Sequence, residues 1–535
     1  MKPLLPAILF AVSLDVAFAS GVRDDETKVG SGQAYASAVA ISDLMENGNI
    51  VRLSQVGAKA MPADIAPLGK LPFKMKQVKR PVFKSNRLTI SDDDKDSAGK
   101  VTKALNAKIA ELSAMGGGRL IVPEGRWLTG RVELQSNVEL YLAEGARLEF
   151  SASIADYQPA VFTRHEGIEV MGAGAFIYAN GAKNIALTGH GVVSGPPMDV
   201  EMRTLRNGNS VVEKDVDYRL PVAERLCDGL DGRTFYRPKS FAPINCKNVL
   251  VEGVTFERSV LWNINPIYCD NVIIRGVTVN SVGVPSGDGI DISSCKNVLI
   301  EYSTLSCGDD CFTLKSGRAE DGLRVGRPTE NVVIRYCLAE KGHGGITCGS
   351  ETAAGIKNVY LHHCVFNGTR TGFRFKTRRN RGGGIWDIAY DNVRLIDVAE
   401  AFTWDLLGSR MYMGELAQRN PPLAVTALTP VVKDITIRNF IIESADRIMS
   451  MNTIPEVPTT GVLLENGVVR TNRIFKTLND VGSLTLRNIT IQATDNNINI
   501  DNSRGITFDN VTFYVPGDSL RYNIKGGKAE KPVLK

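Results

Sequence analysis

One pattern recurs in five short segments: KNVLVEG (247–253), DNVIIRG (270–276), KNVLIEY (296–302), ENVVIRY (330–336) and KNVYLHH (357–363). In each, an Asn precedes alternating apolar residues, and these Asn residues stand at intervals of 23, 26, 34 and 27 residues. A period of roughly 20 to 50 residues is typical of solenoids. Each unit holds one strand of period two and then a turn, and no stretch between the units shows the 3.6-residue apolar period of a helix. The chain is therefore predicted to be all-β, a right-handed parallel β-helix.

The same rhythm extends to both sides of these units, as in VELQSNVELYLAEGARLEF (132–150) and SLTLRNITIQ (483–492). We expect one long β-helix domain over residues 85–535, because solenoids grow by adding coils. Residues 98–114 have apolar side chains near helical spacing and stop at a Gly run, which predicts a short helix capping the first coil. The segment 404–432 contains three prolines, interrupts the rhythm, and is expected to loop out.

The amino-terminal part of the chain differs in composition from the rest. Residues 1–19 carry a Lys, an apolar run and the small-residue site AFA, which is typical of a cleaved secretory signal peptide. This segment is too short to remain as a membrane helix, so the protein is predicted to be soluble and either secreted or periplasmic. Residues 20–84 form an extension of unclear fold, either a small module or a strap along the solenoid, and end in the basic stretch KMKQVKRPVFK (74–84).

The chain has nine cysteines, and Cys246, Cys269 and Cys295 each stand two residues before a ladder Asn. This repetition in phase favours thiols stacked inside the solenoid over a disulfide framework, although export would permit disulfides. The sequence has no Cys-x-x-Cys or His-x3-His spacing of the kind that binds zinc, and no metal site is expected.

Four polar clusters lie among the repeats: SGDGID (286–291), CGDDC (307–311), KGHGG (341–345) and RFK (374–376). Taken singly, each is an ordinary turn or an exposed strand. However, their charged residues fall 12 to 18 positions after a ladder Asn, so we expect them on one face of successive coils, about 4.8 Å apart. Together they supply three carboxylates, an imidazole and two cations, the set that acid/base hydrolysis of an acidic sugar polymer needs. The predicted site residues are Asp288, Asp309, Asp310, His343, Arg374 and Lys376.

In this order on a β-helix, the clusters resemble the active-site motifs of the polygalacturonase family, glycoside hydrolase family 28. That pattern is Asn-Thr-Asp, Gly/Gln-Asp-Asp, Gly-His-Gly and Arg-Ile-Lys. The present chain departs from it at Ser286-Gly287, which replace Asn-Thr, and at Phe375, which replaces Ile and is expected to face away from the groove. LWNINP (261–266) similarly resembles a Trp-x-Ile-His-Pro segment of the family, with Asn265 in place of His.

The resemblance implies an inverting hydrolase that needs no cofactor. In it, Asp309 would be the general acid, and Asp288 with Asp310 would activate water. His343 would tune the Asp309 proton through a hydrogen bond, while Arg374 and Lys376 would bind the galacturonate carboxylate. Crowding of three carboxylates should raise the pKa of at least one of them, which could then serve as the acid.

The net charge of +5 is small for 535 residues, so by itself it indicates little about the substrate class. Six basic residues between Arg370 and Arg381 would attract a polyanion such as pectin, whereas the export signal and the paired Asp residues argue against a nucleic acid. We expect a monomer acting on a pectic polysaccharide, with no membrane partner. Rhamnogalacturonan and xylogalacturonan are alternative substrates. A calcium-dependent pectate lyase and a non-catalytic β-helix protein are alternative functions.

The last expectation concerns the mode of cleavage. About forty residues, 196–236, exceed what one coil uses, so a loop should project near the site and could close one end of the groove. The alternative is an excursion that faces away from it. Because GDDCFTLKSGR (308–318) and GHGGITCGSE (342–351) resemble the exo-acting branch of the family, we expect removal of galacturonate from a chain end.

Overall fold

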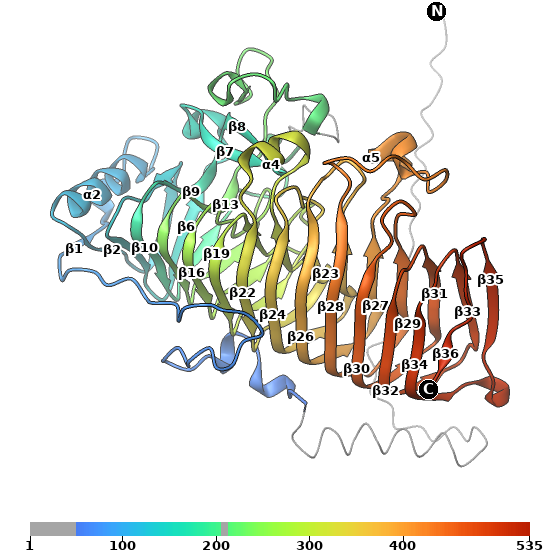
Figure 1. Ribbon diagram of the computed structural model, residues 1–535. Helices are drawn as coiled ribbons and strands as arrows, with labels where there is room; N and C mark the ends of the chain where they lie inside the picture. Colours follow the sequence, from blue (N-terminus) through green and yellow to red (C-terminus); the bar gives the residue numbers. More distant parts are fainter. Residues whose placement is uncertain (1–49, 205–211) are drawn as a thin grey trace, which may run out of the picture.

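The computed structural model describes residues 50–204 and 212–535. The predicted signal peptide, residues 1–19, and the first part of the extension lie outside the described residues. The described chain winds into a right-handed parallel β-helix, in which each coil contributes strands to a few columns that run the length of the molecule (Figure 1). The predicted all-β fold is confirmed.

The first column contains the ladder segments. After β1 (Arg87–Thr89) its strands are β2 (Gly118–Val122), β5 (Val138–Leu142), β10 (Lys183–Gly189), β14 (Lys247–Glu252), β16 (Asp270–Arg275), β19 (Lys296–Glu301), β22 (Thr329–Arg335), β24 (Ile356–Asn367), β26 (Gly384–Ile396), β28 (Val431–Ile442), β30 (Thr460–Thr471), β32 (Leu484–Ala493), β34 (Ile506–Tyr514) and β36 (Val533–Leu534). Its register stacks Val249 on Val272, Val272 on Val298, Val298 on Val332 and Val332 on Val359. All five are buried, so the alternating apolar residues form the core, as predicted.

The second column consists of short strands in the early coils, which merge with the first column from β24 onward: β3 (Gly125–Thr129), β6 (Ala146–Phe150), β11 (Val192–Ser194), β15 (Thr255–Glu257), β17 (Thr278–Asn280) and β20 (Thr304–Ser306). The third column carries the site and contains β4 (Val132–Glu133), β9 (Ala175–Asn180), β13 (Lys239–Ile244), β18 (Ile290–Ser293), β21 (Phe312–Lys315), β23 (Leu338–Cys348), β25 (Thr369–Lys376), β27 (Val398–Asp405), β29 (Ala445–Asn452), β31 (Arg473–Asn479), β33 (Asn497–Asp501) and β35 (Arg521–Lys525).

The ladder Asn residues have a structural role that explains their repetition. Asn248, Asn271, Asn297, Asn331 and Asn358 all adopt the left-handed conformation, with φ between 53° and 58°. Asn tolerates this conformation better than most residues. Their side chains also bond from coil to coil, for example Asn271 Nδ2 to Asn248 Oδ1 at 3.1 Å and Asn358 Nδ2 to Asn331 Oδ1 at 3.1 Å. The Asn therefore turns the chain into each strand and ties it to the previous coil.

Helices are few and short: α2 (Thr102–Ala114), α3 (Glu201–Thr204), α4 (Ala319–Val325) and α5 (Arg410–Met413), with 3-10 turns at Leu53–Gln55, Ala58–Ala60, Asp92–Asp94, Ile154–Tyr157, Val212–Lys214, Val222–Glu224, Gly414–Ala417 and Pro516–Asp518. Helix α2 buries Leu105, Ile109 and Leu112 over the first coil, which confirms the predicted cap. Helix α4 was not expected; it occupies the 34-residue interval between two ladder units. Along the described chain, no helix is long and apolar enough to cross a membrane.

Residues 50–84 form a strap along the outer face of the first column, one of the two forms that the sequence left open (Figure 1). Leu68 and Val78 of the strap pack on Leu250, Ile273 and Leu299 of that column. Two buried arginines of the column also donate to strap carbonyl oxygens: Arg275 Nη2 to Pro62 at 2.6 Å and Arg335 Nη2 to Ala66 at 2.7 Å.

All nine cysteines are buried and unpaired. Cys246, Cys269 and Cys295 follow one another on successive coils, and the Cys269 backbone amide donates to Cys295 Sγ at 3.2 Å. The prediction of thiols packed in the core is confirmed.

Candidate active site

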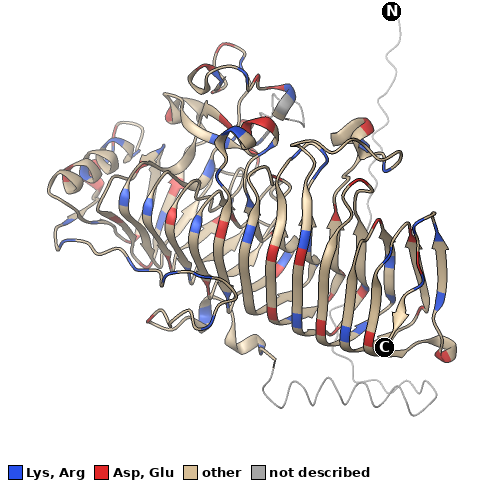
Figure 2. Cartoon of the chain, in the orientation of Figure 1, with Lys and Arg blue, Asp and Glu red and all other residues tan. Residues whose placement is uncertain are grey.

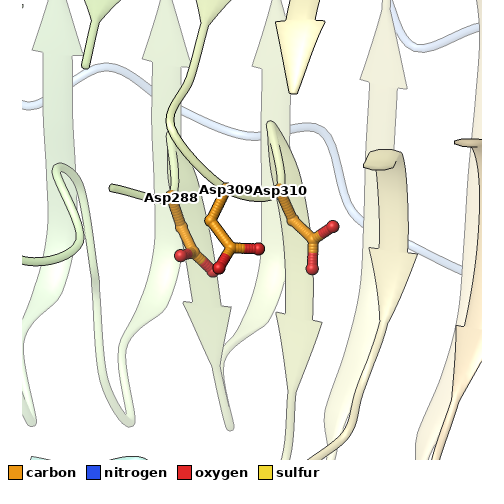
Figure 3. A group of neighbouring side chains, drawn as sticks. All are labelled: Asp288, Asp309 and Asp310. Atoms are coloured by element: carbon orange, nitrogen blue, oxygen red, sulfur yellow. The ribbon is translucent and has the colours of Figure 1, made fainter. Parts of the chain in front are cut away.

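The three predicted carboxylates meet in front of the third column. Asp288 lies just before β18, and Asp309 with Asp310 lies just before β21. One oxygen from each lies within 4.8 Å of the others. Figure 3 shows the three side chains side by side, with their carboxyl groups extending in the same direction and that of Asp309 between the other two. The bend before β21 thus lets both adjacent Asp residues reach the site, as the flanking Cys-Gly and Cys indicated.

Two glycines of the motifs make room for these side chains. A Cβ on Gly344 would lie 2.6 Å from Asp310 Oδ1, and one on Gly308 would lie 2.1 Å from the carbonyl oxygen of Val284. Only glycine fits at either position without displacing its neighbours. Gly344 therefore leaves room for the Asp310 carboxylate, and Gly308 lets the Asp pair lie close to the backbone of the preceding coil.

The other three predicted residues surround this centre. His343 Nδ1 lies 3.2 Å from Asp309 Oδ1, and Arg374 Nη1 lies 3.4 Å from Asp310 Oδ1. Lys376 lines the same cavity, of 380 Å³, as the three Asp residues and Arg374. The ammonium of Lys376 forms no hydrogen bond or ion pair with any residue that the structure describes. The structure thus brings all six predicted residues together.

The structure shows where the residues that depart from the motif pattern lie. Ser286 lines the cavity. Phe375 is buried and stacks on Trp404, with ring centroids 4.7 Å apart, so it faces away from the site as expected. Asn265 is buried behind the site, where its Nδ2 donates to the Asp291 carbonyl oxygen at 2.7 Å.

The carboxylates differ in exposure and in proton affinity. The side chain of Asp309 is 28% exposed, against 6% for Asp288 and 3% for Asp310. Burial, together with the charges of Asp291 and Asp309, raises the pKa of Asp288 well above its ordinary value. Burial also pushes the pKa of Asp309 upward, but the His343 hydrogen bond and the charge of Lys376 outweigh it, and that pKa lies below its ordinary value.

Crowding therefore raises the pKa of one carboxyl group, as predicted, but that group is Asp288 and not the expected acid Asp309. The physical reason is the neighbour of each group. Asp309 accepts a hydrogen bond from His343, and this bond raises the pKa of the imidazole. Asp288 is buried deeper, beside the carboxyl group of Asp291. Proton affinity is thus raised at Asp288 and His343 and lowered at Asp309, relative to the ordinary pKa of each group.

Sequence reasoning missed Lys315, a buried cation close to Asp288, Asp291 and Glu351. Its Nζ lies 3.8 Å from Asp288 Oδ2, 3.5 Å from Asp291 Oδ1 and 3.4 Å from Glu351 Oε2. It also lies 4.5 Å from the ring centroid of Trp262. Burial lowers the pKa of Lys315, but Glu351, Asp291 and Asp288 outweigh that effect and raise it. Lys315 follows the Asp pair by five residues in GDDCFTLK, and alternation along β21 was the only sequence signal that could have placed it.

Two segments wall the cavity. From the excursion between β27 and β28 come Ser409, Tyr412 and Met413, and from the β7–β8 turn comes Glu166. The strands β7 (Val161–His165) and β8 (Ile168–Gly172) form a small sheet with β12 (Leu226–Cys227) of the long loop 196–236. The described part of that loop does not line the cavity but packs behind this hairpin. The predicted wall therefore comes from the hairpin and from the 404–432 segment.

The expected basic cluster divides between two roles. Arg374, Lys376, Arg378 and Arg381 line the cavity. Arg379 is buried away from it, where its Nε donates to Glu456 Oε1 at 2.6 Å. Six acidic and six basic side chains line the cavity in all, and burial together with the neighbouring charges favours the neutral form of Asp288 by raising its pKa. This balance suits an anionic substrate.

A second hollow of 1140 Å³ follows the turns into the third column along the carboxyl-terminal coils. Gly342 and Arg370 line its end nearest the carboxylates, and Gly342 directly precedes His343. The carboxylates that meet within 4.8 Å of one another line the smaller cavity, whereas the acidic residues of the larger hollow are Asp397, Asp446 and Asp518.

The fold and the clustered carboxylates together define a β-helical enzyme of the polysaccharide-hydrolysing class. Residues 227–406 match the family described as glycosyl hydrolases family 28. This match, together with the relatives below, indicates a glycoside hydrolase that acts on O-glycosyl bonds.

Individual relatives agree with this placement. A probable polygalacturonase of Vitis vinifera is 27% identical over 68% of this chain and 70% of its own. The exo-poly-alpha-D-galacturonosidase of Dickeya chrysanthemi is 26% identical, over 53% of this chain and 51% of its own. The crystal structure of an exopolygalacturonase from Thermotoga maritima superimposes with a TM-score of 0.69 and 29% identity, covering 77% of this chain and 93% of that one.

Proposed function

We propose that this protein is a polygalacturonase that hydrolyses α-linked galacturonic acid in pectin. The observation that carries the proposal is the ammonium of Lys376, which forms no hydrogen bond or ion pair with a described residue and lies beside Arg374 in a cavity with three carboxylates. A partly buried cation without a partner favours an anionic ligand group, and a uronate carboxylate meets this need.

The roles follow from exposure and hydrogen bonding. Asp309 is the most exposed of the three carboxyl groups, so it can reach the glycosidic oxygen and act as general acid. The His343 imidazole, 3.2 Å away and with a raised pKa, can pass a proton to Asp309, whose own pKa is lowered. Asp288 and Asp310 are buried behind it and hold the attacking water once Asp288 has lost its proton.

Stereochemistry tests the mechanism. The family resemblance implies inversion, whereas oxygens within 4.8 Å of one another are closer than the roughly 6.5–9.5 Å between carboxyl groups usual for inverting glycosidases. Proton NMR of the first product decides between the two: β-galacturonate from an α-linked substrate shows inversion, and α-galacturonate shows retention.

Exo-cleavage is supported by the two walls. Tyr412, Met413 and Glu166 confine the smaller cavity, whereas the larger hollow continues from the His343 side along the coils. A chain end would occupy the confined cavity while the rest of the polymer leaves through the hollow. Release of monogalacturonate with little early loss of polymer viscosity supports this mode. A rapid fall in viscosity with few reducing ends released contradicts it.

The activity itself is tested by reducing ends released from polygalacturonate, with rhamnogalacturonan and xylogalacturonan as parallel substrates. The Asp288, Asp309 and Asp310 oxygens could also ligate a cation. A pectate lyase would lose activity with a calcium chelator and would form unsaturated products that absorb in the ultraviolet. Lys315, Arg374 and Lys376 already supply positive charge at this point, which favours the hydrolase.

Secretion or periplasmic export is also proposed, and amino-terminal sequencing of the mature protein would test it.

A further inference from the structure

A second charged hollow lies on a different face of the solenoid from the candidate active site. It has a volume of 1100 Å³ and lies between strap residues 67–79 and the beginnings of the first-column strands. We call it the strap groove and define it by its charged lining residues Lys74, Lys76, Lys79, Lys247, Asp270 and Lys296. Figure 2 shows Lys and Arg along the strap where it crosses the sheet. Five lysines and one acid make this groove strongly cationic.

The strap holds its lysines in a set orientation. Residues 73–76 alternate, so that Phe73 and Met75 pack toward the apolar face of the first column while Lys74 and Lys76 are exposed. The backbone at Lys79 is bonded in both directions to a ladder residue: its amide donates to Asn271 Oδ1 at 3.1 Å, and Asn271 Nδ2 donates to its carbonyl oxygen at 2.8 Å. The cations are therefore presented by an ordered segment.

The facing wall comes from the ladder itself. Lys247, Asp270 and Lys296 occupy equivalent positions on successive strands. Lys296 Nζ lies 3.9 Å from Asp270 Oδ2, which is the one ion pair within the groove among the described residues. The ammonium groups of Lys74, Lys76, Lys79 and Lys247 have no ion-pair partner in the described chain. The equivalent strand positions alternate in sign, since Glu330 follows Lys296 on the next coil. The excess of positive charge in the groove therefore comes mainly from the three strap lysines.

We propose that the strap groove is a secondary binding site for a polyuronate chain, separate from the site of cleavage. The inference rests on the proposed function, because the substrate is then a polymer with one carboxylate on each sugar. Such a polymer matches a row of unpaired lysines, and its length allows the same chain or a neighbouring one to occupy both surfaces. A hollow between strap and strands suits an extended polymer better than a flat membrane surface. Binding here would raise the concentration of substrate near the enzyme.

The test uses the Asp309→Asn background, which stops digestion, and measures partition of the protein onto insoluble polygalacturonate at several salt concentrations. The groove variant is Lys74→Gln/Lys76→Gln/Lys79→Gln. The matched control is Lys476→Gln/Lys525→Gln/Lys528→Gln, which removes three exposed lysines from the carboxyl-terminal coils. We expect the groove variant to bind about three- to tenfold more weakly, and the control to bind like the parent. The difference should shrink as salt rises.

Kinetics of the enzyme with Asp309 intact provide the second measurement. With the groove lysines replaced, the apparent KM for long polygalacturonate should rise while the kinetics on digalacturonate stay unchanged. Equal partition of the groove variant and the control would overturn the proposal. A loss of binding to phosphatidylglycerol vesicles or to DNA, with polygalacturonate binding intact, would also overturn it. If the wild-type enzyme releases no reducing ends from polygalacturonate, the proposed function fails. The partition assay measures binding without cleavage, so its outcome is independent of that result.

Discussion

The three carboxyl groups of the site differ because of their neighbours, although all three are Asp. Asp309 faces His343 and solvent, Asp288 is buried beside Asp291, and Asp310 lies next to Arg374. In the proposed mechanism, a single residue type therefore supplies a proton donor and two water-holding groups. The roles depend on environment, since burial favours the neutral form and a nearby cation favours the ionised form.

Replacement of Asp309 by Asn should remove the proton donor while preserving the shape of the side chain. We expect the rate on polygalacturonate to fall about 10²- to 10⁴-fold, the usual contribution of general acid catalysis. The initial rate of reducing-end release measures it, and circular dichroism confirms that the variant is folded. Near-normal turnover by a folded Asp309→Asn variant would show that another group is the acid.

The dependence of the rate on pH should be bell-shaped. As pH rises through the pKa of Asp288, which burial raises, the water-activating carboxylate forms and the rate increases. The pKa of His343 is raised above its ordinary value of about 6.5 by Asp309, so its imidazolium persists to higher pH and is lost as pH rises through that raised value. The rate should then fall, which gives the alkaline limb of the profile.

Replacing His343 by Gln should reduce kcat by less than Asp309→Asn does and should abolish this alkaline limb. An unchanged alkaline limb would exclude His343 as the proton source.

Lys315 should act through the ionisation of Asp288. Without its charge the pKa of Asp288 rises further, so Lys315→Met should move the acidic limb of kcat/KM to higher pH and lower the rate at neutral pH. Lys315→Arg keeps the charge and should restore much of the activity. Thermal unfolding of both variants separates this effect from loss of structure, because a purely structural role would leave the acidic limb in place.

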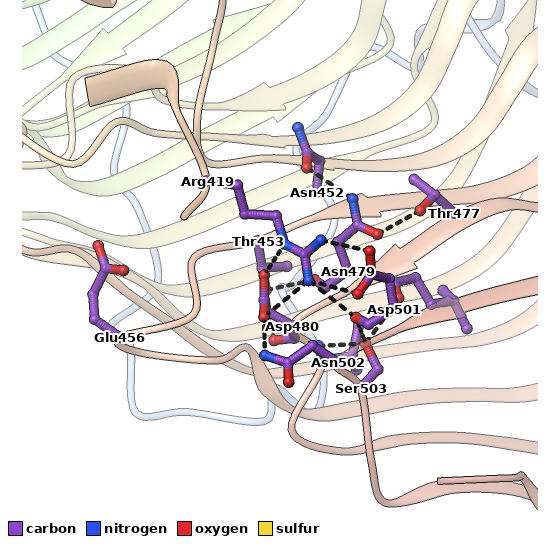
Figure 4. Close-up of polar contacts among 12 residues, drawn as sticks. Arg419, Asn452, Thr453, Glu456, Thr477, Asn479, Asp480, Asp501, Asn502 and Ser503 are labelled. Carbon is purple, nitrogen blue, oxygen red and sulfur yellow. Dashed lines mark hydrogen bonds and ion pairs between the residues drawn. The ribbon is translucent and has the colours of Figure 1, made fainter. Parts of the chain in front are cut away.

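At the scale of elements, the excursion between β27 and β28 is held to the solenoid by two arginines. Arg379 donates to the carbonyl oxygens of Leu416 and Arg419. Arg419 Nη1 in turn donates to Asp501 Oδ2 at 2.7 Å and the same guanidinium bonds Asp480 (Figure 4). These contacts fix the segment that presents Tyr412 and Met413 to the cavity.

Release of this anchor should change the products more than the rate. In Arg419→Gln the wall loses its contact with Asp480 and Asp501 and becomes more mobile. We expect the share of oligomers among early products to rise relative to monogalacturonate, as resolved by anion-exchange chromatography. Arg487→Gln, at an exposed ion pair on a nearby coil, is the matched control. An unchanged product profile in the Arg419 variant would mean that the wall does not determine the mode of cleavage.

At the scale of the whole molecule, stability comes from one continuous apolar core that runs through the coils and contains eight of the nine thiols. The ninth, Cys227, is buried in a smaller cluster at the β7–β8 hairpin. Burial raises the pKa of several of these thiols, among them Cys269 and Cys348, so they stay protonated and unreactive. The core therefore does not depend on covalent links.

The melting temperature should accordingly be the same with and without excess dithiothreitol. Thiol titration in denaturant should count all nine cysteines without prior reduction. A fall in melting temperature on reduction, or a cystine-linked peptide in a non-reduced digest, would contradict the observed packing.

The sequence by itself determined the fold and the six residues at the centre of the site. Both depend on local patterns: the Asn that turns into each strand, the apolar residues of period two, and short motifs repeated at the interval of a coil. In a solenoid such local signals suffice, because each coil contacts mainly its neighbours and the period places equivalent residues side by side.

The tertiary structure alone decided the surroundings of that centre. Lys315 meets Glu351 across 36 positions, Arg419 meets Asp480 across 61, and Arg335 meets the strap at Ala66 across 269. No period relates these partners, so no repeat in the sequence marks them. The raised pKa of Asp288 and the lowered pKa of Asp309 were likewise hidden, because a pKa depends on burial and on neighbouring charges, and these exist only once the coils have stacked.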